Sequence, residues 1–160
     1  MAQDKMLVVY YSRTGNTEKV AQAIAGELAC DIEEVVDKKE RRGRFAFVAA
    51  GIQAHRKKLT QIEDPVHSPG DYGTVIIGTP VWAGKMSCAV RTYISRTKDA
   101  LPSVAFFLTT GGAGIDSTFA DMAEACGKEP VARLALKEKE VRRTEEWQER
   151  VSAFVKELSP

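Results

Sequence analysis

The sequence predicts an α/β fold, a three-layer αβα sandwich around a five-stranded parallel sheet. Short apolar runs alternate with amphipathic stretches five times along the 160 residues, and this alternation is typical of consecutive βα units. The apolar runs are continuous, as in Val75-Ile76-Ile77, which indicates strands covered by helices on both faces. A chain of this length suits one core, so we expect residues 1–160 to form a single domain.

The predicted strands are short and rich in β-branched or aromatic residues. They lie at Met6–Tyr11, Asp31–Val36, Thr74–Thr79, Ser103–Leu108 and Val131–Leu136. Asp31–Val36 is more acidic than the other four, so we expect it near an edge of the sheet.

The predicted helices place apolar residues three or four positions apart, which gives each helix one apolar face. They lie at about Gly15–Ala29, Met86–Lys98, Asp116–Cys126 and Thr144–Leu158. Pro65 and Pro69 exclude a long helix at Thr60–Gly73, which we interpret as a loop. We interpret Glu138–Arg143 as a charged connector.

The segment Asp37–Lys58 is basic at both ends and apolar in the middle, which predicts a further helix. Its basic residues are Lys38, Lys39, Arg41, Arg42, Arg44, Arg56, Lys57 and Lys58, and its apolar stripe is Phe45, Val48, Ala49 and Ile52. The ordinary interpretation is a solvated face over a packed stripe. The alternative is a docking surface for an anionic partner, such as an acidic protein, a nucleotide phosphate or a membrane surface.

Composition excludes several classes of function. The net charge is +1, so no basic field favours nucleic acid. No apolar run approaches the roughly 18 residues that span a bilayer, and the short run that follows Asp4 and Lys5 does not resemble a signal peptide. We therefore expect no nucleic-acid partner, no integral membrane segment and a cytoplasmic location.

Cysteine and histidine are too sparse to indicate a metal centre. Cys30, Cys88 and Cys126 are odd in number and form no CxxC pair, so neither a disulfide framework nor a zinc site is expected. His55 and His67 have no partner at metal-ligand spacing. Cys88 would lie in the first turn of a helix, where thiol pKa values fall, so a redox role is the alternative to a packed small residue.

Three unusual loops each follow a predicted strand. They are Ser12–Thr17, Gly78–Lys85 and Thr109–Gly114. The carboxyl ends of parallel strands share one edge of a sheet, and ligands bind there at the topological switch point. If the first and third strands flank that point, the strand order is 2-1-3-4-5. This is one of the two common strand orders of doubly wound α/β sheets.

The first loop has the composition of a phosphate site. It joins a strand to a helix, where unpaired N–H groups and the helix dipole favour an anion. Ser12, Thr14 and Thr17 add hydroxyl donors, and Gly15 allows close approach of the backbone. The alternative is an ordinary capped turn. Because the loop lacks both the P-loop motif and three spaced glycines, a phosphate here would belong to a mononucleotide.

The second and third loops suit a planar ring. Trp82 offers a flat apolar surface, and backbone groups near Gly84 can hydrogen-bond the edge of a heterocycle. Thr110, Gly111 and Gly112 allow backbone to approach the ring from the other side. Taken alone, Trp82 could equally be a packing residue, but the three loops together favour a ring platform.

Two of these loops resemble those of the flavodoxin family. Residues 12–17, Ser-Arg-Thr-Gly-Asn-Thr, are similar to its S/T-x-T-G-x-T loop for the FMN phosphate, and residues 78–84 are similar to its flavin-ring loop. The resemblance implies a flavodoxin-like fold with FMN as cofactor. It implies the binding residues Ser12, Arg13, Thr14, Gly15, Asn16 and Thr17 for the phosphate, and Thr79, Pro80, Val81, Trp82, Ala83 and Gly84 for the ribityl chain and ring.

The sequence also departs from the electron-carrier flavodoxins. Thr109–Asp116 lacks the tyrosine that stacks on the outer flavin face in those carriers, and the net charge of +1 contrasts with their acidity. That face would be open, or covered by another element or by a second subunit in a homodimer. We expect the fully reduced step to have a less negative potential than in acidic carriers.

The resemblance implies a redox protein that transfers electrons through bound FMN. Its partner would be a redox protein or a small-molecule electron donor or acceptor. The alternatives are an FMN-dependent NAD(P)H- or quinone-linked oxidoreductase, including a relative of the flavodoxin-like protoporphyrinogen oxidases, and a flavin-free binding module on the same fold. No set of side chains indicates a nucleophile or a general acid, so we name no catalytic residue.

Overall fold

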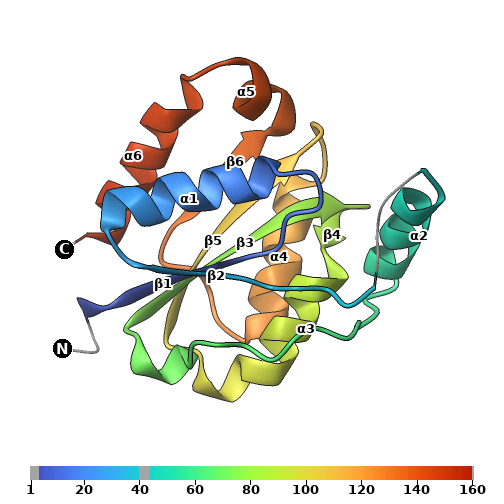
Figure 1. The fold of residues 1–160 in the computed structure, drawn as a ribbon, viewed down its shortest axis with the longest axis horizontal. Helices are drawn as coiled ribbons and strands as arrows, with labels where there is room; N and C mark the ends of the chain where they lie inside the picture. The colour runs from blue at the N-terminus through green and yellow to red at the C-terminus, as the bar shows by residue number, and fades with distance from the viewer. Residues whose placement is uncertain (1–3, 40–43, 160) are drawn as a thin grey trace.

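A computed structural model describes residues 4–39 and 44–159. It contains one six-stranded sheet with helices on both faces (Figure 1). Its strands are β1 (Met6–Tyr10), β2 (Asp31–Glu34), β3 (Thr74–Trp82), β4 (Lys85–Met86), β5 (Ser103–Thr110) and β6 (Arg133–Lys137). The parallel strands lie in the order β2-β1-β3-β5-β6. The predicted α/β fold class and the order 2-1-3-4-5 of the main strands are thus confirmed, with the acidic strand at an edge.

The helices form the outer two layers. They are α1 (Asn16–Leu28), α2 (Arg44–His55), α3 (Cys88–Thr97), α4 (Ile115–Cys126), α5 (Glu138–Arg143) and α6 (Trp147–Leu158), with short 3₁₀ turns at Pro69–Asp71 and Lys98–Ala100. α1, α5 and α6 cover one face of the sheet, and α3 and α4 cover the other (Figure 1). In the described ranges no helix has the length and hydropathy needed to cross a membrane.

The core is divided between the two faces of the sheet. Along β5, Phe106 faces α3 and α4, whereas Phe107 faces α1 and α6, and both side chains are fully buried. Trp147 of α6 belongs to the second of these clusters. This alternation follows from the period of two in a strand, and burial on both faces explains why the strand sequences are continuously apolar.

Three expectations about elements were wrong. β3 continues to Trp82, and an antiparallel strand, β4, pairs with its end, so most of the second loop is a β-hairpin. Glu138–Arg143, interpreted as a charged connector, is the helix α5, and the Glu140 carboxylate stabilises its start by accepting the N–H of Lys137 at 2.9 Å. The predicted stripe of α2 is not its packed face.

The packed face of α2 is made of small residues. Ala50 and Ala54 are buried, whereas Val48 and Ile52 are 54% and 51% exposed. Alanine lets the helix approach its neighbours closely, so the larger side chains at the predicted stripe face solvent. The side chain of Phe45 and the residues Arg41 and Arg42 lie outside the described part of the chain.

We expect Gly78→Ala to destabilise the fold by about 3 kcal/mol or more, because overpacking of a rigid core is costly. A Cβ atom at Gly78 would lie 1.9 Å from Cζ of Phe107, whose ring is fully buried. Gly26→Ala is the matched control. It lies on the exposed side of α1 with nothing within 4 Å of the new Cβ, so it should stabilise the helix by about 0.5–1 kcal/mol. Urea unfolding measures both changes, and equal effects would contradict the packing argument.

Candidate functional site

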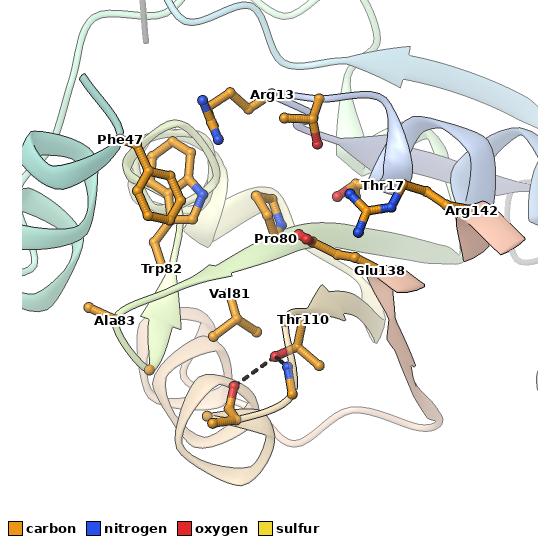
Figure 2. Close-up of a pocket in the computed structure, with 16 residues that line it drawn as sticks. Arg13, Thr17, Phe47, Pro80, Val81, Trp82, Ala83, Thr110, Glu138 and Arg142 are labelled. Carbon is orange, nitrogen blue, oxygen red and sulfur yellow. Dashed lines mark hydrogen bonds between the residues drawn. The ribbon is translucent and has the colours of Figure 1, made fainter. Parts of the chain in front are cut away.

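The three loops enclose one cavity of about 780 Å³ at the carboxyl edge of the sheet. It is lined by Arg13, Thr14, Thr17, Phe47, Pro80, Val81, Trp82, Ala83, Gly84, Thr110, Gly111, Gly112, Ala113, Gly114, Glu138 and Arg142. In Figure 2, Arg13, Phe47 and Trp82 gather at one end, and Thr17, Glu138 and Arg142 lie toward the other. The cavity therefore has an aromatic end and a polar end.

The polar end is built on the start of α1. Gly15 precedes the helix with φ +99°, and its N–H donates to Oγ of Ser12 at 3.0 Å. The Thr17 hydroxyl lies 2.7 Å from that of Thr109 at the end of β5. The first N–H groups of a helix have no partner within it, so they and the dipole favour an anion at this point. The loop is therefore held in place by one hydrogen bond within it and by one to β5.

The aromatic end is built on the β3–β4 hairpin. Ala83 and Gly84 form its two-residue turn with φ of +50° and +76°, the backbone that such a turn requires in a twisted hairpin. Trp82 lies at the base of this turn and is 5% exposed. The rings of Tyr11 and Trp82 are perpendicular and in contact, with centroids 5.5 Å apart. Trp82 is thus fixed as part of the wall of the cavity.

The third loop closes against the hairpin. Oγ1 of Thr110 donates to O of Ala113 at 2.7 Å and accepts from N of Gly112 at 3.1 Å (Figure 2). Ser117 donates to the carbonyl of Gly84 at 2.8 Å. A Cβ atom at Gly114 would lie 2.9 Å from Cα of Gly84, so the two loops are in direct backbone contact.

A buried ion pair connects the β3–β4 hairpin to α3 and α4. Nη2 of Arg91 in α3 bonds Oδ2 of Asp121 in α4, and both side chains are almost fully buried. The same Oδ2 accepts the N–H of Met86 in β4 at 3.1 Å. One carboxylate therefore joins α3, α4 and β4, and this fixes the hairpin that carries Trp82.

The structure brings most of the predicted site residues to the cavity, but not all. Arg13, Thr14 and Thr17, residues 80–84 and residues 110–112 line it. Ser12, Gly15 and Asn16 lie in the same loop without lining the cavity. Thr79 is fully buried, and its hydroxyl bonds O of Pro80 and N of Ser87. It does not reach the cavity.

Five residues that line the cavity were not predicted as site residues: Ala113 and Gly114 at the end of the third loop, and three from outside the loops. Phe47 reaches it from α2, and Glu138 and Arg142 reach it from α5. Glu138 and Arg142 are four residues apart on a helix and so share a face. A helix prediction for this segment would therefore have placed the two side chains together. The position of Phe47 follows from how α2 packs, which no local pattern specified.

The three thiols and His67 do not line the cavity. Burial raises the pKa values of Cys30 and Cys126 to about 11, and Cys88 is fully buried. The Nδ1 atom of His67 lies 2.6 Å from Oε1 of Glu33. Among residues 4–39 and 44–159, no group of three His, Cys, Asp or Glu residues could hold a metal ion.

Comparison with known proteins gives consistent matches. A family model described as Flavodoxin matches residues 5–152. The FMN complex of a flavoprotein from Lactobacillus acidophilus NCFM has 25% identity and a TM-score of 0.72, over 87% of this chain and 97% of that one. Oxidised flavodoxin 2 from Bacillus cereus has 18% identity and a TM-score of 0.63, over 97% of both chains. At 18% identity, the similarity to the flavodoxin from Bacillus cereus concerns the fold alone.

We expect Gly114→Ala to destabilise the protein by about 2–3 kcal/mol, because it combines a left-handed backbone with a backbone clash. Gly15→Ala is the control, since Gly15 also has a left-handed backbone, with φ +99°, but has nothing within 4 Å of a new Cβ. It should cost about 1 kcal/mol. Thermal and urea unfolding compare the two variants, and similar losses would show that contact between the loops contributes nothing.

Proposed function

Since the chain belongs to the flavodoxin family, as the match over residues 5–152 shows, we propose that it binds FMN in this cavity and transfers electrons through the bound flavin. One observation carries the proposal: a single cavity has helix N–H groups and threonine hydroxyls at one end and a tryptophan at the other. The phosphate and the ring of a flavin mononucleotide need these two environments.

The phosphate end fits the cofactor through the chemistry of its donors. Thr14 and Thr17 line the cavity at the start of α1, where the Thr17 hydroxyl also bonds that of Thr109. Backbone N–H groups and the helix dipole there can bind a dianion without a metal. We propose that residues 12–17 hold the phosphate, with Ser12, Gly15 and Asn16 shaping the loop.

The aromatic end of the cavity suits the flavin ring because of its shape. Trp82 is a fixed wall, and the third loop contributes only small residues between Gly111 and Gly114, so backbone can lie against a planar ring. The third loop has no aromatic residue, but Phe47 projects into the cavity from α2 and is 55% exposed. We propose that Phe47 covers the flavin face that the third loop leaves open.

FMN, when bound, supplies the redox chemistry, and the protein supplies binding, orientation and limited access. Pro80 and Val81 would exclude water from one side of the ring, while backbone groups of Ala83 and Gly84 would meet its edge. The electron donor or acceptor would be a protein or a small molecule that reaches the open side of the cavity. We also propose a cytoplasmic location, which suits the three free thiols.

A quinone-linked reductase is the second candidate, and a neighbouring hollow favours it. This hollow, of about 610 Å³, is lined by Phe47, Val48, Gly51, Ile52, His55, Arg56, Val81, Trp82 and Ala83. It shares Trp82 and Phe47 with the first cavity and could admit an apolar ring close to the flavin. Steady-state turnover with NADPH and a quinone separates an enzyme from a carrier.

We expect the purified protein to bind FMN and Thr14→Ala to weaken that binding about tenfold, the typical effect of losing one hydrogen bond to a charged group. Fluorescence titration in phosphate-free buffer measures the affinity. Ser68→Ala is the control, because Ser68 is exposed, makes no capping bond and lies away from the cavity. A protein that does not bind FMN would favour the flavin-free binding module.

We expect the fully reduced step to have a less negative potential than in strongly acidic flavodoxins. A negative surface disfavours the addition of negative charge to the flavin, and the net charge of this chain is +1. Spectroelectrochemical titration of the FMN-loaded protein at two ionic strengths measures the potential. A potential as low as that of the acidic carriers would contradict this electrostatic argument.

A further inference from the structure

Arg142 projects into the polar end of the cavity from an element outside the three loops. It belongs to α5, which begins directly after β6 and therefore at the same edge of the sheet. Figure 2 shows its guanidinium group toward the end of the cavity where Thr17 lies. A cation at this point would face the phosphate in the proposed function.

α5 packs against α1, and these contacts fix the position of Arg142. Val141 is fully buried, and Nζ of Lys19 in α1 donates to its carbonyl oxygen at 3.1 Å. At the start of α5, the N–H of Lys137 donates to Oε1 of Glu140 at 2.9 Å, and Arg150 of α6 lies 3.4 Å from the same oxygen. These contacts fix the rotation of the short helix.

That rotation determines which charged residues reach the cavity. Glu138 and Arg142 are one helical turn apart and line it. Arg142 and Arg143 are both exposed, but Arg143 does not line the cavity. In the part of the chain that the structure describes, no carboxylate lies within ion-pair distance of Arg142. Its donors are therefore available to an anionic ligand.

We propose that Arg142 is a specificity-determining residue that selects the phosphorylated form of the flavin over riboflavin. The inference rests on the proposed function. A guanidinium group binds a phosphate through charge-assisted, often bidentate, hydrogen bonds, and riboflavin has no group that could replace the phosphate. Glu138, on the same face, acts in the opposite sense by repelling the phosphate.

The test compares FMN and riboflavin binding to four proteins by fluorescence titration: the unmodified chain, Arg142→Gln, Glu138→Gln and Arg143→Gln. Arg142→Gln should weaken FMN binding about tenfold and riboflavin binding less than twofold. Glu138→Gln should strengthen FMN binding only. Arg143→Gln, the matched control, should change neither. Arg142→Lys, which keeps the charge, should restore part of the selectivity.

Equal weakening of both flavins in Arg142→Gln, or no weakening of either, would overturn the proposal. Failure of the unmodified chain to bind any flavin would instead overturn the proposed function. In that case titration of the apoprotein with inorganic phosphate, followed by NMR, still decides on the anion site. Shifts at Thr14 and Thr17 that are reduced in Arg142→Gln but not in Arg143→Gln would support it, and identical shifts in all proteins would contradict it.

Discussion

Parallel pairing of β1 with β3 is the constraint on which the site depends. It places Tyr10 opposite Gly78, and the N–H of Tyr11 donates to the carbonyl of Gly78 at 3.2 Å. The loop at residues 12–17 therefore leaves the sheet beside β3, which runs on toward the Trp82 hairpin. Because Gly78 also accommodates the ring of Phe107, the packing of the core and the position of the site are fixed by the same residue.

Most of the fold could be predicted because its signals are local. Continuous apolar runs identify strands buried on both faces, and the positions of the three special loops identify the shared edge. The hairpin and α5 were missed because their signals are weak: β4 has two residues, and the start of α5 depends on one hydrogen bond from the N–H of Lys137 to the Glu140 carboxylate. In α2, alanines form the packed face, so the usual preference for large apolar residues pointed to the wrong side.

The residues of the candidate site could be predicted where they belong to one short loop. They could not be predicted where the packing of a separate helix brings them to the cavity. Thr14 and Thr17 belong to a short motif at a strand–helix junction, and such motifs can be recognised in sequence. Phe47 and Arg142 reach the cavity only because α2 and α5 dock at particular angles. Thr79 shows the converse: it lies in the expected loop, yet its hydroxyl is used inside the protein.

Local charge, not net charge, decides what such a cavity can bind. The net charge of +1 gives no hint of an anion site, but the charged residues that line the cavity are Arg13, Arg142 and Glu138. Arg13 packs over the ring of Phe47, with Cζ 5.0 Å from its centroid, so that cation lies at the aromatic end. Arg142 and Glu138 remain at the polar end, and in the proposed function their opposite charges would set the balance between attraction and repulsion of a phosphate.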